Sequence, residues 1–205
     1  LARLGKLADQ VIAVRAGLEG LDEIGLEAKL AQLRALSKFE RNAQSARISA
    51  ADVQVMAGIN EAVRRVLGFR PHREQIIGAF AILEGSIAEM ATGEGKTLTA
   101  TLPMYLASLT GQGAHLATAN DYLAARDAEL MTPVYEMLGA TIGIVTSDTP
   151  QCNRRQAYLS DITYSTAKEV GFDFLRDRLV NRHHELEGTG GLTPASEKQV
   201  QRDLN

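Results

Sequence analysis

A short apolar segment, a glycine-containing turn and the beginning of a helix follow one another between Ile87 and Thr97, in the sequence Ile-Ala-Glu-Met-Ala-Thr-Gly-Glu-Gly-Lys-Thr. Glycine tolerates the backbone conformations of a tight turn and has no side chain to block a ligand. Backbone N–H groups around Gly93–Lys96 can therefore point at phosphate oxygens, at the positive end of the helix that follows. This order of elements is typical of a phosphate-binding loop, and it favours an α/β fold.

The side chains that end the turn are suited to nucleotide chemistry. We expect Lys96 to place its ammonium group beside the β- and γ-phosphates of ATP, and the Thr97 hydroxyl to be a ligand of the nucleotide's Mg²⁺. Both side chains are predicted to be needed for phosphoryl transfer and are the candidate catalytic residues. The other loop residues assigned to nucleotide binding are Thr92, Gly93, Glu94 and Gly95.

Phosphate-binding loops commonly begin with a glycine at the position that is Met90 in this chain. The Ala-x-x-Gly-x-Gly-Lys-Thr form is the helicase and translocase variant, and Gly93–Thr97 match its last five positions. A chance Gly-Lys-Thr triplet in a turn is the simpler alternative. The strand-like segment before the turn and the helix-like segment after it favour the phosphate loop.

Strand-like and helix-like segments alternate after Gly85. The expected strands are Ile87–Met90, Ala114–Ala119, Ile142–Val145 and Ile162–Tyr164. The expected helices between them are Thr97–Leu109, Tyr122–Leu138 and Ala167–Val180. This alternation predicts βαβ units and a mainly parallel, twisted sheet with helices on both faces. A flexible loop over Asn181–Pro194 and a polar helical tail from Ala195 are expected to follow.

The residues before Gly85 have helical periodicity. Helices are expected over Leu1–Leu21 and Glu27–Lys38, followed by a polar linker over Glu40–Ser49. Further helices are expected from an N-cap at Ser49 to Leu67, with Gly68 ending the helix, and from Pro71 as first helical residue to a stop at Gly85. We accordingly divide the chain into an N-terminal helical segment, 1–68, and a partial motor domain, 69–205.

The charge balance argues against a nucleic-acid partner. The 205 residues include 22 basic and 25 acidic side chains, with a net charge of −3, so no overall positive field attracts a phosphate backbone. The longest apolar stretches, such as Ala79–Leu83, are far shorter than the roughly 20 residues that cross a membrane. We therefore predict a soluble chain that does not bind nucleic acid.

Three separated blocks carry a family resemblance. They are Ile87–Thr99, Thr118–Asp127, and Asp161–Thr166 together with Gly171–Asp177. In this order the blocks resemble SecA, the preprotein translocase ATPase. The resemblance is close over Val66–Asp177 and looser before it, and it implies a RecA-like phosphate-loop domain preceded by helices.

The resemblance also implies roles for residues outside the loop. Gln75 matches the adenine-reading glutamine of the family, and Phe69 lies where an adenine-packing residue is expected, whereas His72 differs from the family's usual aromatic residue. Arg126, with Asp127, matches the family's second helicase motif, near the phosphates. From the residues alone, an ordinary exposed pair on a helix explains Arg126 and Asp127 equally well.

Asp173 and Arg176 lie three residues apart within the third block. That spacing places them on one helix face, where they are explained as an ion pair. We therefore give neither residue a catalytic role.

A SecA-type motor implies ATP and Mg²⁺ as cofactors and the SecYEG channel and unfolded preproteins as partners. It implies a cytoplasmic protein, peripheral on the inner bacterial membrane, with a homodimer as a possibility. In the family, a tail like Val200–Leu204 leads into the strand that carries the Walker B carboxylates. Asp121 and Asp148 are not convincing replacements for those carboxylates. We therefore expect the 205 residues of this chain to bind ATP but to hydrolyse it negligibly.

Other classes of protein stay open at this point. A DEAD-type nucleic-acid helicase shares the phosphate loop and is one alternative. A small phosphate-loop kinase is another, but such a kinase would normally begin with its loop strand, whereas the expected loop strand of this chain begins only at Ile87. A SecA-like accessory protein that binds nucleotide without hydrolysis is the non-enzymatic alternative. The amphipathic helix at Leu1–Leu21 is either packed on its own domain, as most such helices are, or docks on a membrane or another subunit.

Overall fold

The computed structural model describes residues 1–41 and 48–186, and the side chains of 1–35 and 48–179. The chain divides into two units. The first unit comprises Leu1–Gly111 with Met131–Ala140, and the second comprises Gln112–Leu130 with the residues from Thr141 onward. One helix, α6 (Asp121–Met137), contributes residues to both units.

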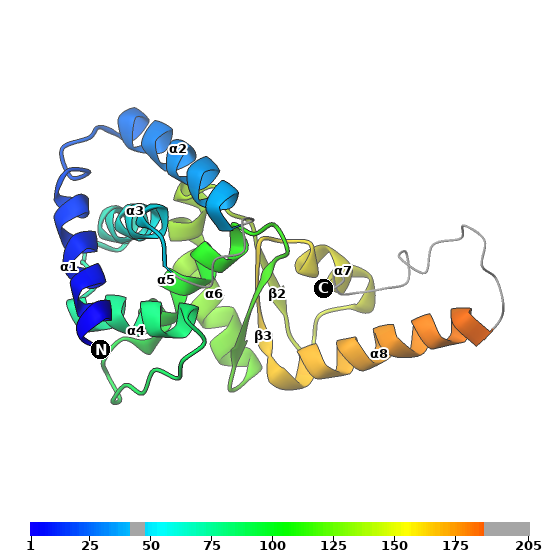
Figure 1. The fold of residues 1–205 in the computed structure, drawn as a ribbon. Helices are drawn as coiled ribbons and strands as arrows, with labels where there is room; N and C mark the ends of the chain where they lie inside the picture. Colours follow the sequence, from blue (N-terminus) through cyan, green and yellow to red (C-terminus); the bar gives the residue numbers. More distant parts are fainter. Residues whose placement is uncertain (42–47, 187–205) are drawn as a thin grey trace. The chain divides into compact units, whose positions relative to one another are not determined.

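The first unit is helical (Figure 1). Its helices are α1 (Ala2–Ala16), α2 (Glu23–Arg41), α3 (Ala50–Leu67), α4 (Arg73–Leu83) and α5 (Lys96–Ser108), with the end of α6. Helix α3 packs against α1, α2 and α5, and its Met56, Ile59 and Val63 are fully buried. Burial on several sides explains why α3 is apolar over most of its surface.

Helix α3 begins and ends where the sequence predicts. The Ser49 hydroxyl accepts a hydrogen bond from the Asp52 N–H (3.1 Å), and the Asp52 carboxylate accepts one from the Ser49 N–H (3.0 Å). This reciprocal capping satisfies two amides that have no partner within the helix. Gly68 ends the helix at φ 77°, a conformation that glycine adopts without strain.

Helix α4 begins later than predicted. His72 is the N-cap and Arg73 the first helical residue, so Pro71 lies before the helix and the predicted start at Pro71 is wrong. The Gln75 side chain decides this boundary, because its Oε1 accepts a hydrogen bond from the His72 N–H (2.8 Å). The predicted stop is confirmed, with Gly85 at φ 77°.

The second unit contains a parallel three-stranded sheet (Figure 1). The strands β1 (Ala114–Thr118), β2 (Ile142–Val145) and β3 (Ile162–Thr166) are ordered β1-β3-β2. Every β3 residue is buried, as expected for a central strand. Helices α7 (Gln151–Tyr158) and α8 (Ala167–Leu186) pack against the sheet. The sheet confirms the prediction of parallel strands alternating with helices.

Two local predictions are wrong, and one helix was not predicted. Ile87–Met90 does not form a strand, because no strand lies beside it among the described residues, and Ile87 is 97% exposed. A strand needs a hydrogen-bonded neighbour. Helix α7 was not predicted, because its residues are mostly polar. Helix α8 continues to Leu186, so no loop begins at Asn181. The predicted polar tail from Ala195 lies outside the described residues.

A buried charge cluster joins α7 to α8. Arg154 on α7 forms ion pairs of 2.8 Å with both Glu169 and Asp173 on α8, and all three side chains are at least nine-tenths buried. Asp173 also pairs with Arg176 (2.7 Å), which confirms the ion pair expected from their spacing. The remaining Arg154 donors reach the carbonyl oxygens of the loop after β2, at residues 146 and 149. The cluster therefore fixes α7, α8 and this loop to one another.

Helix α7 approaches β2 so closely that only glycine fits at position 143. A Cβ atom built on Gly143 would overlap the carbonyl oxygen of Ala157 and lie 2.7 Å from its carbonyl carbon. We expect Gly143→Ala to lower the free energy of unfolding by at least about 1–3 kcal/mol, because α7 must move away from the sheet. Urea denaturation followed by circular dichroism measures this change.

Gly171 provides the matched control, because a Cβ atom there meets nothing within 4 Å. Gly171→Ala lies within α8 and is expected to stabilise the protein by about 0.5–1 kcal/mol through helix propensity. Equal stability of the Gly143→Ala variant and the unmodified protein would show that α7 does not pack as described.

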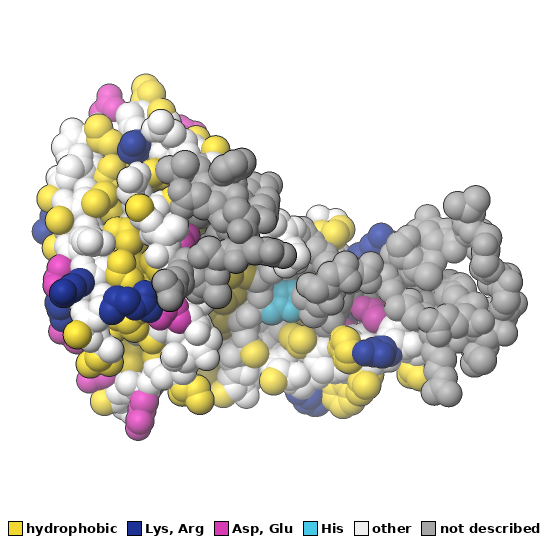
Figure 2. Space-filling model, viewed as in Figure 1, with side chains coloured by type: hydrophobic (Ala, Val, Ile, Leu, Met, Phe, Trp, Pro, Cys, Tyr) yellow, Lys and Arg dark blue, Asp and Glu magenta, His cyan; other side chains and the backbone are white. Residues whose placement is uncertain are grey.

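Charged side chains of both signs are mixed on the helical unit. On the face drawn in Figure 2, basic side chains lie beside acidic ones. Ion pairs join Arg3 to Glu84, and Arg73 to Asp9 with 2.6 Å between their closest atoms. Among the described residues, none of the helices combines the length and the apolar character that crossing a membrane requires.

Candidate nucleotide-binding site

The predicted phosphate loop lies at the beginning of α5. Gly95 is the N-cap of this helix at φ 77° and Gly93 has φ 88°, so both adopt the left-handed backbone that favours glycine. Residues 91–96 are all exposed. The first amides of α5 therefore face an open loop at the positive end of the helix dipole, which is an arrangement suited to an anion.

Two charged side chains of the loop turn back onto Ala91. The Ala91 N–H donates to Glu94 Oε2 (2.8 Å), and Lys96 Nζ donates to the Ala91 carbonyl oxygen (2.7 Å). The Glu94 carboxylate thus accepts a hydrogen bond from a backbone amide of the loop, so this amide is positioned to bind an anionic oxygen. Ala91 was not among the sequence candidates, because it contributes backbone atoms only.

Gln75 connects α4 to the loop. Its Nε2 donates a hydrogen bond to the Glu94 carbonyl oxygen (2.9 Å), while its Oε1 accepts from the His72 N–H. A Cβ atom on Gly95 would overlap Gln75 Nε2, so the close approach as well as the backbone conformation requires glycine. The amide keeps one N–H and one lone pair beyond these two bonds, which is the donor and acceptor pair that reading an adenine edge needs.

Phe69 and His72 line one pocket of about 690 Å³ just before α4. Phe69 is 50% exposed, so part of its side chain can contact a ligand. The other side chains on this pocket include those of Arg15, Arg64, Arg70 and Arg73. The pKa of Arg15 is lowered from its ordinary value, and burial of the guanidinium group is the largest cause. The structure thus places Phe69 beside His72, and Gln75 beside the loop.

Thr92 and Thr97 belong to the same unit as Gln75. Thr92 is exposed on the loop, and Thr97 is the second residue of α5, with its side chain half-buried. The Thr97 carbonyl oxygen accepts a hydrogen bond from the Thr101 hydroxyl (2.9 Å). Thr97 therefore has a fixed backbone position in the first turn of α5, next to Lys96.

Arg126 lies on α6 in the second unit. Its guanidinium group donates two hydrogen bonds, of 2.9 and 2.6 Å, to one carboxylate oxygen of Asp127, and it lies 5.9 Å from the ring centroid of Tyr122. Adjacent side chains on a helix do not usually face each other. The long Arg126 side chain nevertheless reaches around the helix to Asp127.

The carboxylates of Asp121 and Asp148 differ in their surroundings. The Asp121 carboxylate accepts hydrogen bonds from the hydroxyl (2.5 Å) and the N–H (2.9 Å) of Ser147, and these bonds hold the pKa of Asp121 below its usual range. Asp148 is exposed. The described part of the chain contains no group of three or more His, Cys, Asp or Glu side chains arranged to hold a metal ion.

The comparisons with known proteins agree with this architecture. The fold is a RecA-like α/β domain with helices at its N-terminal side. The family model described as the SecA DEAD-like domain matches residues 1–205. The chain belongs to the SecA family.

Relatives in three bacteria illustrate the similarity. Over 152 residues, 71% of this chain, it is 53% identical to protein translocase subunit SecA 2 of Rhodopirellula baltica. It is 44% identical over 178 residues to protein translocase subunit SecA of Clostridium acetobutylicum, and 45% identical over 179 residues to that of Cellvibrio japonicus, each covering 87% of the chain. The matched regions span 23%, 21% and 19% of these relatives, respectively.

Proposed function

We propose that the loop at the beginning of α5 binds the phosphates of Mg-ATP, as the nucleotide-binding portion of a SecA-type motor. The observation that carries this proposal is the exposed helix N-terminus at Lys96, with Gly95 as its left-handed N-cap. Amides at such a terminus bind phosphate oxygens without a large rearrangement. The proposed nucleotide-binding portion belongs to a motor domain that begins at residue 69.

Each candidate residue has a defined task in this proposal. Lys96 exchanges its hydrogen bond with the Ala91 carbonyl oxygen for phosphate oxygens, and the Thr97 hydroxyl is a ligand of the Mg²⁺. The loop backbone from Thr92 to Gly95 surrounds the phosphates. Phe69 packs on the adenine and Gln75 reads its edge. Mg²⁺ supplies charge neutralisation when it is bound.

We propose that these 205 residues alone bind nucleotide but hydrolyse it negligibly. Hydrolysis needs a carboxylate that holds Mg²⁺, a group that orients water, and usually an arginine that stabilises the transition state. Asp121 is already bound to Ser147, and Asp148 is not part of a carboxylate cluster. A colorimetric phosphate-release assay tests this, and turnover above about 1 s⁻¹, the lower limit of typical enzymes, would contradict it.

For the whole protein we propose ATP-driven movement of unfolded secretory preproteins through a SecYEG channel, on the cytoplasmic face of the bacterial inner membrane. Support comes from the SecA family membership and from relatives named protein translocase subunits. A nucleic-acid helicase and a non-hydrolysing SecA-like accessory protein are the alternatives. Salt-dependent RNA binding would favour the helicase.

Gln75→Ala tests the assignment of the base-reading residue. We expect this change to weaken ATP binding by about tenfold, the effect of losing one to two hydrogen bonds, and to weaken the binding of tripolyphosphate, which has no base, by clearly less. Competition against a fluorescent ATP analogue measures both affinities. Gln32→Ala, on the exposed surface of α2, is the control and should change neither.

The outcome of this experiment separates two roles of Gln75. An equal loss of affinity for ATP and for tripolyphosphate would mean that Gln75 acts by holding the Glu94 carbonyl oxygen, and would remove the adenine-reading assignment. No binding of ATP or tripolyphosphate by the unmodified protein would overturn the proposed function itself.

A further inference from the structure

Strand β2 is an open edge of the sheet. It pairs with β3 on one side, and no strand among the described residues pairs with its other side. The Thr141 carbonyl oxygen accepts a hydrogen bond from the Ile162 N–H (3.0 Å), so the Thr141 backbone faces β3. Because backbone groups alternate along a strand, the N–H and C=O groups of Ile142 and Ile144 face outward.

The outward edge of β2 lacks the usual protection against strand addition. Proteins commonly block an exposed edge with a charged side chain, a proline or a bulge. Residues 140–147, Ala-Thr-Ile-Gly-Ile-Val-Thr-Ser, contain no charge and no proline, and β2 pairs with β3 in continuous register. The side chains of Ile142 and Ile144 are half-buried. The edge is therefore open to another strand.

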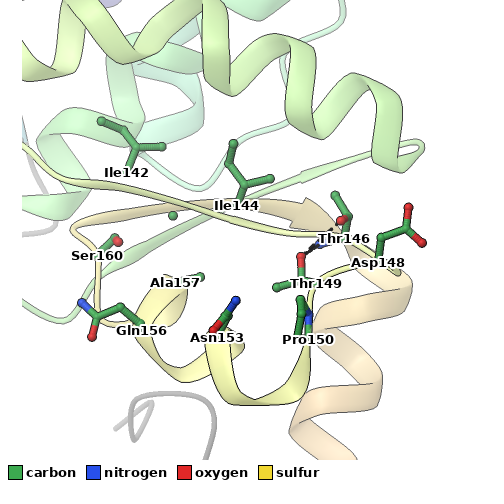
Figure 3. A pocket seen from close by; sticks show the side chains of 11 residues that line it. Ile142, Ile144, Thr146, Asp148, Thr149, Pro150, Asn153, Gln156, Ala157 and Ser160 are labelled. Carbon is green, nitrogen blue, oxygen red and sulfur yellow. Dashed lines mark hydrogen bonds between the residues drawn. The ribbon is translucent and has the colours of Figure 1, made fainter.

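A groove of about 680 Å³ accompanies this edge. Figure 3 shows Ile142 and Ile144 of β2 along one side of it, and Asn153 and Gln156 of α7 along the other. Asn153 and Gln156 are exposed and lie three residues apart, so their amides share one face of α7. An amide side chain both donates and accepts, as does each residue of a polypeptide backbone.

The charge on the groove favours one kind of ligand over another. Among the residues that the structure describes, no basic side chain lines the groove, and Asp148 is the one charged lining residue. Asp148 follows the carboxyl end of β2 and lies at one end of the groove (Figure 3). A phosphate-bearing ligand finds no cation there, whereas an uncharged extended chain with a basic residue at that end is complementary to it.

We propose that the outer edge of β2 and the amide-bearing face of α7 bind an extended polypeptide segment, which joins the sheet as an additional strand and places a basic residue beside Asp148. Backbone hydrogen bonds to Ile142 and Ile144 supply the affinity in this mode of recognition, and the groove selects the side chains. This proposal is independent of the nucleotide site, because none of these residues is among the nucleotide-binding candidates.

The test uses a short fluorescein-labelled peptide of alternating threonine and valine with a lysine at one end. Its matched control carries N-methyl groups on alternate residues, which remove backbone donors and leave the side chains unchanged. We expect the unmethylated peptide to bind at least about tenfold more tightly in fluorescence anisotropy. Bound peptide should slow hydrogen exchange at the amides of Ile142 and Ile144 by about tenfold or more, because these two amides gain partners.

A charge placed on the edge should block the peptide. We expect Ile144→Lys to weaken binding by about tenfold or more, because a lysine on an exposed edge opposes strand addition. Leu130→Lys adds the same charge at an exposed apolar position of α6 within the same unit, and should leave binding unchanged. Circular dichroism verifies that both variants are folded.

Three outcomes would overturn the proposal. The first is equal binding of the methylated and unmethylated peptides, and the second is a lack of new protection at Ile142 and Ile144 when peptide is saturating. The third is protection of both amides without peptide that increases with protein concentration. Sedimentation would then reveal a dimer, and the edge would bind a second copy of the chain instead.

Discussion

Lys96→Ala is expected to lower the affinity of the protein for Mg-ATP by about 10- to 100-fold. A charge-assisted hydrogen bond to a phosphate contributes about 1.5–3 kcal/mol, and each 1.4 kcal/mol is a factor of ten in affinity. The loss should be large because Lys96 is the first residue of α5, where the loop amides and the helix dipole already concentrate positive potential. Titration with a fluorescent ATP analogue measures the affinity.

The control for Lys96→Ala is Lys6→Ala, which removes the same charge from the exposed surface of α1. Lys6→Ala should bind Mg-ATP as the unmodified protein does. Because Lys96 is exposed and its Nζ donates to a loop carbonyl oxygen, we expect the folded state to survive its removal. Equal affinity of the Lys96→Ala variant and the unmodified protein would refute the proposed phosphate site.

Arg154→Met is expected to destabilise the protein by about 3–5 kcal/mol, the cost of breaking a buried ion pair. The Arg154 side chain is 5% exposed, and its loss leaves the carboxylates of Asp173 and Glu169 buried without it. Methionine fills much of the same volume but donates no hydrogen bond to either carboxylate. Urea denaturation followed by circular dichroism measures the change in the free energy of unfolding.

The neighbouring Arg155→Met makes the same chemical change on a half-buried side chain. We expect it to cost less than about 1 kcal/mol, because an ion pair that water reaches contributes little. Similar losses for Arg154→Met and Arg155→Met would mean that the cluster does not hold α7 against α8.

Much of the fold follows from short-range signals in the sequence. Ser49 and Gly68 mark the two ends of α3 because capping depends on residues that are close in sequence. Strand β2 matches its expected bounds, Ile142–Val145, because a short apolar run is bounded by polar residues. The segment Ile87–Met90 has the same kind of apolar pattern, but no strand within residues 1–41 and 48–186 lies beside it, and pairing is a property of the whole sheet.

The candidate site was partly predictable for the same reason. The left-handed conformations of Gly93 and Gly95 follow from the local pattern of the loop. The hydrogen bond from Gln75 to the Glu94 carbonyl oxygen joins residues 19 positions apart, so no local pattern encodes it. The Arg154 cluster was missed because α7 has no apolar periodicity and its role depends on residues of α8.

In the proposed site, the bridge made by Gln75 would make the two ends of a bound nucleotide energetically interdependent. One amide group is hydrogen-bonded to the residue before α4 and to the turn before α5, so a purine that repositions this amide also shifts the backbone around the phosphates. By reciprocity, occupancy of the turn alters the preference for the base by the same free energy. Adenosine and tripolyphosphate should consequently bind as cooperating fragments, with affinities that do not simply multiply.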